Sequence, residues 1–360
     1  MKKVLILHTA VGLGHKTIAE NIGRSLTEAG FEVKLADIGA VQGGKFEKVV
    51  VGIHQFINKR LPFVWGFIYR FGHYPILPFR ITIAGFNYKN AKSLIDKYQP
   101  DIVITTQTAA SAVIAYLKKK GFYQKLFGIA FSDYHLHPYW LYDRADFYLA
   151  NITEQKQRMI NTGVSADKIF ITGFNLSSPL QIDKQAVRAK FNINSHQKVI
   201  LLGSGSLGIG LDDYLLTQLS ARLNWHTIVV CGNNQIIHKK LLGEYHQPNI
   251  SIVGFYQPMD ELYAIADIFL SKPGGLSTAE ALRFYLPMVI TSMLPGQEKL
   301  NLEYLRSHSL VMPKVKDVLE QINLELDTGA FRLSLQNNPA VKDLLTAPSA
   351  AACLTEYLAR

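Results

Sequence analysis

The sequence predicts an α/β protein with two Rossmann-like, doubly wound domains. Short apolar runs of buried-strand type alternate with helical segments, which is typical of parallel sheets covered on both faces. The alternation stops near residue 172 and then restarts, so it describes two domains in tandem. The chain has 360 residues, 48% of them hydrophobic, which suffices for two separate cores.

The first domain is predicted to span residues 1–172 and the second residues 173–345, with residues 173–183 as the linker. The tail, residues 346–360, is expected to pack back on the first domain. In such sheets ligands bind outside the carboxyl ends of the strands, so two domains that face each other enclose a cleft. The expected strands are 3–9, 31–38, 101–106 and 126–132, then 198–202, 227–231, 250–253, 268–270 and 288–291. The expected helices are 16–29, 109–120, 214–223, 259–266 and 278–284.

Bulk composition predicts a cytoplasmic protein. The apolar run at the N-terminus is too short for a secretory signal, and the chain has no uninterrupted stretch of about 18 apolar residues. Cys231 and Cys353 are too few and too distant to form a disulfide framework. A reducing compartment is therefore expected.

A basic, aromatic segment predicts contact with a membrane. Residues 48–95 contain no Asp or Glu but seven Lys and Arg, and the net charge of the whole chain is +10. Aromatic and aliphatic residues with only positive charge are typical of an element that lies on an anionic membrane, here the inner face of the cell membrane. Nucleic-acid binding and a buried helical hairpin are the alternatives. The predicted membrane residues are Lys59, Arg60, Phe63, Trp65, Phe67 and Arg70.

A glycine pair after the expected strand 268–270 predicts a nucleotide site. Glycines let a ligand approach the backbone, and the free N–H groups of a helix start favour a phosphate. Two hydroxyls add donors, and a carboxylate one turn later suits ribose hydroxyls. The alternative is an ordinary helix cap after a tight turn. The residues assigned to this site are Lys272, Gly274, Gly275, Ser277, Thr278 and Glu280.

Two further loops carry candidate binding residues. Gln297 and Glu298 open the next helix, and an amide beside a carboxylate suits a neutral sugar; the alternative is a first-turn acid that complements the helix dipole. Residues 203–208 fit the dinucleotide pattern G-x-G-x-x-G, but no acid follows at residues 231–234 for a ribose. We interpret this turn, with Ser204 and Gly205, as a phosphate cradle or a tightened loop.

His15 and Asp133 are the candidate catalytic bases. His15 follows Gly14 in the first strand–helix turn, where a histidine is readily poised as a general base; a capping histidine is the alternative. Asp133 follows the expected strand 126–132. His135 and His137 with one aspartate are too little for a metal pattern, so no metal is predicted.

These motifs resemble those of glycolipid glycosyltransferases, the family of monogalactosyldiacylglycerol synthase and processive diacylglycerol glucosyltransferase; the peptidoglycan GlcNAc transferase is a more distant relative. The matching stretches are residues 12–15 (Gly-x-Gly-His), 132–140 (Ser-Asp-x-x-x-His-x-x-Trp), 253–259, 272–280 and 295–301. The relatives usually have Thr where Ser132 stands.

The resemblance implies a GT-B fold and an inverting, metal-independent transfer from a UDP-sugar, with no other cofactor. It places uracil near Gly254 and Phe255, ribose on Glu280, diphosphate on residues 274–278 and the sugar on Gln297 and Glu298. Gly14, His137 and Asn301 match family motifs and are assigned to substrate binding.

The expected acceptor is diacylglycerol or a glycosyl-diacylglycerol, and the sugar is glucose or galactose. A transferase for a polyprenyl-diphosphate sugar, a UDP-sugar epimerase of the same fold and a non-catalytic lipid- or nucleic-acid-binding module are the alternatives. No nucleic-acid partner is expected.

Overall fold

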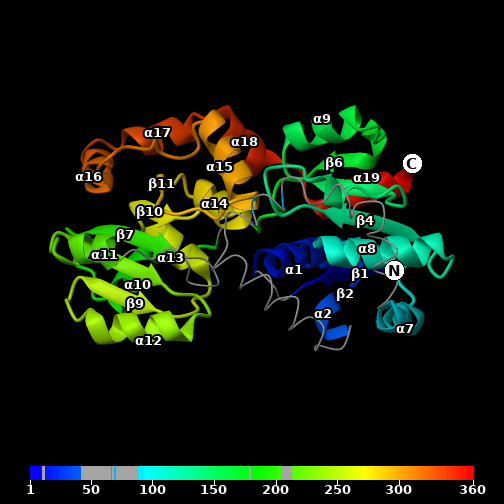
Figure 1. Cartoon of the computed structure of the whole chain (residues 1–360), viewed down its shortest axis with the longest axis horizontal. Helices are drawn as coiled ribbons and strands as arrows, with labels where there is room; N and C mark the ends of the chain where they lie inside the picture. The colour runs from blue at the N-terminus through cyan, green and yellow to red at the C-terminus, as the bar shows by residue number, and fades with distance from the viewer. Residues whose placement is uncertain (10–12, 42–65, 67–68, 70–87, 178–179, 204–212) are drawn as a thin grey trace. The chain divides into compact units, whose positions relative to one another are not determined.

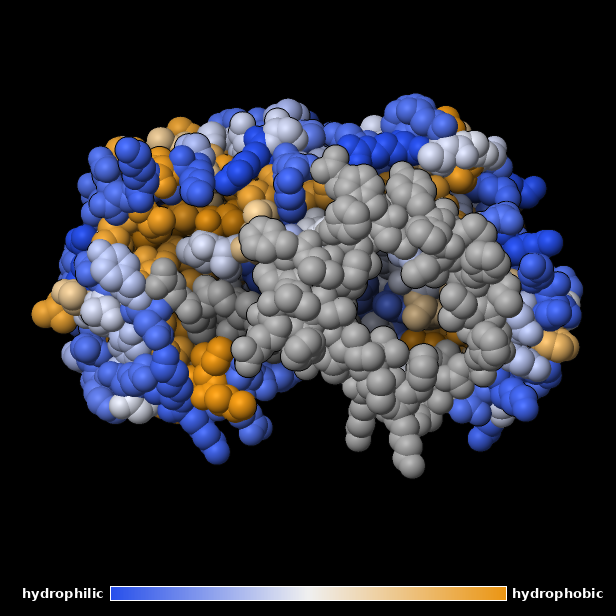
Figure 2. Space-filling view, in the orientation of Figure 1, coloured by the Kyte–Doolittle hydropathy of each residue, from blue (hydrophilic) through white to orange (hydrophobic). Residues whose placement is uncertain are grey.

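The computed structural model describes residues 1–9, 13–41, 66, 69, 88–177, 180–203 and 213–360. The chain divides into two compact units (Figure 1). Unit 1 comprises Met1–Ser177, Leu294–Leu300 and Thr346–Arg360, and unit 2 comprises Ser178–Met293 and Asn301–Leu345. In the space-filling view, polar and charged side chains form most of the outer edge of the described surface (Figure 2).

Unit 1 contains a six-stranded sheet in the order β2-β1-β3-β4-β5-β6, with every neighbouring pair parallel. Its strands are β1 (Lys3–His8), β2 (Glu32–Asp37), β3 (Ile102–Thr105), β4 (Leu126–Ala130), β5 (Phe147–Ala150) and β6 (Ile169–Ile171). Its helices are α1 (Leu13–Glu28), α2 (Ile38–Val41), α7 (Lys89–Tyr98), α8 (Thr108–Lys119), α9 (Thr153–Asn161) and α19 (Ala350–Ala359).

Unit 2 contains a five-stranded parallel sheet in the order β11-β10-β7-β8-β9. Its strands are β7 (Lys198–Gly203), β8 (Trp225–Val230), β9 (Ile250–Val253), β10 (Ile268–Ser271) and β11 (Met288–Ile290). The helices of this part of the chain are α10 (Lys184–Lys190), α11 (Asp213–Ser220), α12 (Gln235–Glu244), α13 (Met259–Ile265), α14 (Gly275–Arg283), α15 (Gln297–Ser307), α16 (Val318–Thr328), α17 (Ala330–Gln336) and α18 (Pro339–Thr346). The predicted α/β class with two doubly wound parallel sheets is confirmed.

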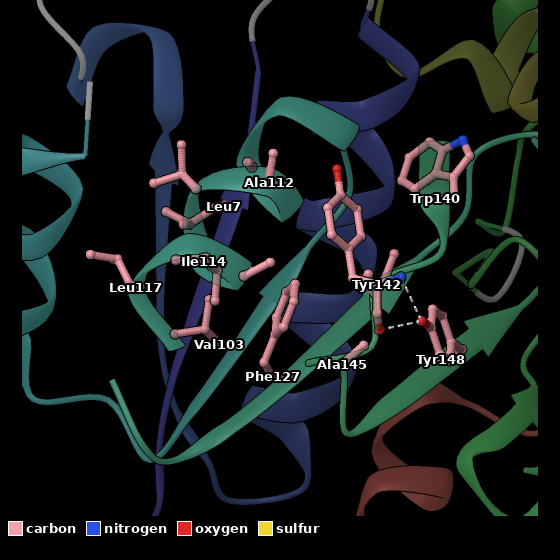
Figure 3. Close-up of a cluster of buried hydrophobic side chains, with 14 of the residues drawn as sticks. Leu7, Val103, Ala112, Ile114, Leu117, Phe127, Trp140, Tyr142, Ala145 and Tyr148 are labelled. Atoms are coloured by element: carbon pink, nitrogen blue, oxygen red, sulfur yellow. Dashed lines mark hydrogen bonds between the residues drawn. The ribbon is translucent and has the colours of Figure 1, made fainter. Parts of the chain in front are cut away.

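Both faces of the unit 1 sheet are buried, as parallel strands require. Leu5 and Leu7 of β1 belong to the core cluster that also contains Val103 of β3 and the buried face of α8 (Figure 3). Successive side chains of a strand point to opposite faces, so Ile6 faces the other side, where α1 packs against it at Gly23. Burying a Leu or Ile side chain contributes about 1.5–3 kcal/mol each, so this two-sided core is the main source of the unit's stability.

Polar groups at the edge of this core are hydrogen-bonded. The buried hydroxyl of Tyr148 accepts from the backbone N–H of Tyr142 at 3.0 Å and donates to its carbonyl oxygen at 2.9 Å (Figure 3). This pairing ties β5 to the loop that follows Trp140. A buried phenol without hydrogen-bond partners would cost free energy. The two hydrogen bonds of Tyr148 remove this cost inside the cluster.

The C-terminal helix α19 lies in unit 1. Tyr357 packs its ring against Phe147 of β5 at a centroid distance of 5.3 Å and donates to the carbonyl oxygen of Asp146. At the other end, the backbone N–H of Ala350 donates to Asn175 Oδ1 at 3.1 Å. These contacts hold the C-terminal tail against β5 and against Asn175.

One glycine in the central sheet is required by close packing. Gly128 of β4 pairs directly with Phe147 of β5. A Cβ atom on Gly128 would lie 2.2 Å from the Phe147 ring, which real contacts never show. The missing side chain therefore makes room for the aromatic ring.

We expect Gly128→Ala to lower the free energy of unfolding by about 1–3 kcal/mol, the usual cost of overpacking a core. Denaturant unfolding measures the change. Gly243→Ala is the matched control, because a Cβ atom there meets nothing within 4 Å and alanine favours the helix α12. Equal stability of the Gly128→Ala variant and wild type would contradict the packing argument.

Candidate functional site

Each sheet reverses its strand order at one point, where ligands of such folds bind. In unit 1 the reversal lies between β1 and β3, and in unit 2 between β7 and β10. The first turn of α1, after β1, carries His15, the loop after β4 carries Asp133, and the turn between β10 and α14 carries the glycine pair. The candidate residues therefore lie at the sheet edges that the topology favours.

His15 lies in the first turn of α1, next to Gly14. Thr106, which follows β3, donates its hydroxyl to the carbonyl oxygen of His15 at 2.9 Å and so joins the two loops at the reversal. The imidazole lies beside the ring of Trp140 at a centroid distance of 6.2 Å. Its Nδ1 is buried and has no hydrogen-bond partner among the residues that the structure describes.

The surroundings of His15 keep its ring neutral. Burial lowers the pKa of His15 below its usual value of 6.5, although the negative charge of Asp133 partly opposes the shift. A neutral imidazole can accept a proton, whereas an imidazolium cannot. A neutral imidazole at this position has the protonation state that a general base requires.

Asp133 is buried, with 5% of its surface exposed, and its carboxylate is hydrogen-bonded. Its Oδ2 accepts from Ser132 Oγ at 3.2 Å and from Gln297 Nε2 at 2.7 Å. Its backbone carbonyl accepts from the side-chain amides of Asn151 at 2.9 Å and Gln155 at 2.7 Å. Ser132 and Gln297 thus satisfy the buried carboxylate, whereas Asn151 and Gln155 hold the backbone that carries it.

His137 is engaged inside the protein through both ring nitrogens. Its Nδ1 accepts from the backbone N–H of Tyr139 at 3.2 Å, and its Nε2 lies 2.9 Å from the carbonyl oxygen of Tyr69. A carbonyl can only accept, so Nε2 carries the proton and the imidazole is the neutral Nε2–H tautomer. The geometry favours a role in holding Tyr69 over direct contact with a substrate.

In unit 2, helix α14 begins at Gly275 with Gly274 as its N-cap, and no described side chain caps it. By contrast, Asn234 caps α12 and Asp317 caps α16. The first N–H groups of α14 are thus donors for an anion. Gly274 has an ordinary φ of −73°, so backbone conformation does not require glycine there, but a Cβ atom on it would lie 2.9 Å from Ser277 Oγ.

Three predicted binding residues shape the glycine loop itself. Thr278 is fully buried and donates its hydroxyl to the carbonyl oxygens of Gly274 and Gly275 at 2.7 and 3.0 Å. Ser277 Oγ donates to the carbonyl of Gly274 at 3.3 Å. Asn301, also fully buried, donates to the carbonyl of Pro273 at 3.1 Å. These side chains hold the loop from within.

Glu280 lies in α14, and one of its oxygens accepts from the hydroxyl of Tyr263 at 3.3 Å. Burial raises the pKa of Glu280 to about 7; Arg283 opposes this shift and Asp260 adds to it. The carboxylate is thus poorly solvated when no ligand is present. Hydroxyl donors from a ribose would favour its ionised form.

The remaining predicted residues fall into three groups. Gly254 and Phe255 follow β9, and Phe255 is 50% exposed. Lys272 is partly buried directly after β10, and Glu298 accepts from the backbone N–H of Leu294 at 2.7 Å, which closes the loop before α15. The predicted residues outside the described part of the chain are Ser204, Gly205, Lys59, Arg60, Phe63, Trp65, Phe67 and Arg70.

The sequence analysis missed Gln155, Asn151 and Tyr69. Gln155 is fully buried in α9, and its amide also donates to the carbonyl of His135 at 3.0 Å. A glutamine in a polar helix carries no periodic signal of burial, so only the fold reveals it. Among the described residues, no group of three or more His, Cys, Asp and Glu side chains could hold a metal ion, and no helix is long and apolar enough to cross a membrane.

Comparison with known proteins agrees with these motifs. The family model for monogalactosyldiacylglycerol (MGDG) synthase matches residues 15–175. A processive diacylglycerol beta-glucosyltransferase of Bacillus cytotoxicus is 28% identical over 347 residues, which cover 93% of this chain and 88% of the relative. The chain is thus similar to glycolipid glycosyltransferases, over residues 15–175 by the family model and over most of its length by the relative.

Solved structures agree with the fold. The glycotransferase of kitacinnamycin superposes with a TM-score of 0.68 at 14% identity, covering 99% of this chain and 98% of that one. The UDP-GlcNAc 2-epimerase from Neisseria meningitidis, bound to UDP-GlcNAc, gives 0.60 at 14% identity and full coverage of both chains. The predicted GT-B fold class is thereby confirmed.

The pKa of Glu280 predicts a pH-dependent effect of Glu280→Gln on stability. The native carboxyl binds its proton more tightly than the unfolded one, whose pKa is near 4.5, so the wild type loses stability as pH rises from about 4.5 to about 7. Glutamine does not titrate. The free energy of unfolding of the variant should therefore rise relative to that of wild type by up to roughly 3 kcal/mol between pH 5 and pH 8.

Denaturant unfolding at the two pH values measures this difference. Glu303→Gln, at an exposed position of α15, controls for the loss of one negative charge. A stability difference between the Glu280→Gln variant and wild type that is the same at both pH values would contradict the assignment.

Proposed function

We propose that this protein is an inverting glycosyltransferase that moves a hexose from a UDP-sugar to diacylglycerol, or to a glycosyl-diacylglycerol, at a membrane surface. The observation that carries the proposal is the partly buried, neutral imidazole of His15 within electrostatic reach of the buried carboxylate of Asp133, at the carboxyl ends of the unit 1 strands. An acceptor hydroxyl needs such a base when it attacks an anomeric carbon. The named activity of the Bacillus relative supports the lipid acceptor.

The donor is assigned to the loops of unit 2. The uncapped start of α14 is suited to the diphosphate, because N–H groups and the helix dipole favour negative charge there. Glu280 receives the ribose hydroxyls, and Gly254 with Phe255 receives the uracil. We propose glucose as the hexose, because the curated relative is named a glucosyltransferase.

The reaction balances as a single displacement. The acceptor oxygen forms a bond to the anomeric carbon while the bond from that carbon to the diphosphate oxygen breaks, and UDP leaves with both electrons. His15 takes the acceptor proton, and the charge of Asp133 stabilises the imidazolium that forms. Inversion converts the α-linked UDP-glucose into a β-glucoside, in agreement with the "beta" in the relative's name.

Peripheral membrane binding on the cytoplasmic side is part of the proposal. Its support is the segment 48–95, which has seven basic residues and no acidic ones. Each basic residue near an anionic surface contributes about 1 kcal/mol. Flotation of the wild type with anionic but not with neutral vesicles would support this, whereas equal recovery with both would contradict it.

The function is tested by incubating the purified protein with vesicles that contain diacylglycerol and with UDP-glucose or UDP-galactose. We expect a glucosyl-diacylglycerol on thin-layer chromatography, resistant to α-glucosidase. Release of free UDP without a glycolipid, or interconversion of UDP-sugars, would overturn the proposal, and the latter would indicate an epimerase of the same fold. A product only with a polyprenyl-diphosphate sugar would reassign the acceptor.

His15→Ala should lower kcat by roughly 10²–10⁴, the usual contribution of a positioned general base. The affinity for UDP, measured by calorimetry, should hardly change, because the proposed UDP contacts are in unit 2. In the wild type, kcat should fall only when the pH drops below 6.5, because the base must be neutral and its pKa is lowered. A near-normal kcat in a folded His15→Ala protein would transfer the role to Asp133.

A further inference from the structure

Tyr69 lies within the basic, aromatic segment that the sequence assigns to a membrane, yet it is bound to the loop that carries Asp133. Its phenol oxygen is 2.6 Å from Nε2 of His135, two residues after Asp133. Its backbone carbonyl accepts from Nε2 of His137 at 2.9 Å. Its ring also packs against His137 at a centroid distance of 4.3 Å. Three separate interactions thus join one tyrosine to residues 133–137.

The phenol of Tyr69 stays protonated. Burial raises its pKa well above the usual value of 10, and the negative charge of Asp133 raises it further. A neutral phenol can donate a hydrogen bond to the imidazole of His135, which is itself buried with 4% of its surface exposed. Hydrogen bonds between buried groups are costly to break, so the loop loses a specific restraint when this phenol is removed.

The same tyrosine contacts the loop before Gln297. Gly296 has a φ of +98°, and a Cβ atom on it would lie 3.2 Å from Cβ and Cγ of Tyr69. One helical turn earlier, a Cβ atom on Gly66 would lie 2.8 Å from Cβ of Pro295. Gly66 therefore packs closely against Pro295, and Gly296 packs closely against Tyr69. Each contact has a glycine on one side, which leaves room for the side chain on the other.

The loop of residues 133–137 and the loop of residues 295–297 meet at the carboxylate of Asp133. Gln297, directly after Gly296, donates its amide to Asp133 Oδ2 at 2.7 Å. Tyr69 touches the loop that carries the donor and the loop that carries the acceptor of this bond. A shift of Tyr69 would therefore displace both Asp133 and Gln297.

We infer that Tyr69 is a positioning residue for glycosyl transfer: it holds the Asp133 loop and the Gln297 loop in one geometry. The inference rests on the proposed function. A misplacement of about 1 Å in a catalytic constellation can cost about 100-fold in rate, so a residue that touches no reacting atom can still control kcat.

Tyr69→Phe tests the inference, because it keeps the ring and the backbone carbonyl but deletes the phenol. We expect kcat to fall by about 10-fold to 100-fold, with the Kd for UDP nearly unchanged. Tyr88→Phe is the matched control: Tyr88 stacks on Phe122 at 5.8 Å, at the start of α7, and its phenol has no part in the site. Unchanged kcat for Tyr69→Phe, under conditions where wild type is active, would overturn the inference.

Variants of His135 test the same hydrogen bond from its other side. His135→Leu should match Tyr69→Phe in kcat, and His135→Gln, which keeps an acceptor near the place of Nε2, should retain more activity. Combining Tyr69→Phe with His135→Leu should cost little more than either change alone, because both delete one interaction. If Tyr69→Phe fails to fold, His135→Leu and His135→Gln still test the inference. Equal activity of these two variants would overturn it.

Hydrogen exchange separates this inference from the proposed function. Tyr69→Phe should speed amide exchange in residues 133–137 and 295–297, whereas Tyr88→Phe should not. If the wild type transfers no hexose, the proposed function fails, and the exchange pattern still reports whether Tyr69 restrains both loops. Unchanged exchange in both loops would overturn the inference whatever the reaction.

Discussion

The buried carboxylate of Asp133 is the constraint on which unit 1 depends. A buried charge is tolerated only with hydrogen-bond donors or opposite charge around it, and here donors come from widely separated parts of the chain. Ser132 is adjacent, Gln297 lies 164 residues away, and the buried amides of Gln155 and Asn151 hold the backbone that carries the carboxylate. The same charge opposes the lowering of the His15 pKa and raises that of Tyr69.

In unit 2, the backbone N–H groups at the start of α14 have no side-chain cap among the described residues. Gly274 does not cap α14 with a side chain, so the N–H groups at the helix start remain available. The loop in front of them is held by the internal hydrogen bonds of Thr278 and Asn301. Glu280 is destabilised as an anion in the absence of a ligand. Such preorganised but incompletely satisfied groups are typical of binding sites.

Much of the fold was predictable because it rests on local patterns. Apolar runs between helical segments predicted the two parallel sheets, and the glycine pair predicted the turn between β10 and α14. The strands β5 and β6 were missed, since they are short, with four and three residues, and carry no turn signal of their own. Of the helices α15 to α19, the sequence predicted only the start of α15, at Gln297 and Glu298; α16 and α19 were missed although the capping residues Asp317 and Ser349 precede them.

The sequence by itself determined the fold class, the family motifs and the identity of the charged and glycine residues at the strand ends, because these depend on spacing along the chain. Only the tertiary structure decided what those side chains contact. It directs the hydroxyl of Thr278 and the amide of Asn301 inward to backbone carbonyls, and it uses both nitrogens of His137 inside the protein. It also brings Tyr69, Gln155 and Gln297 to Asp133 and its loop, contacts that span 22 to 164 residues and leave no periodic trace in the sequence.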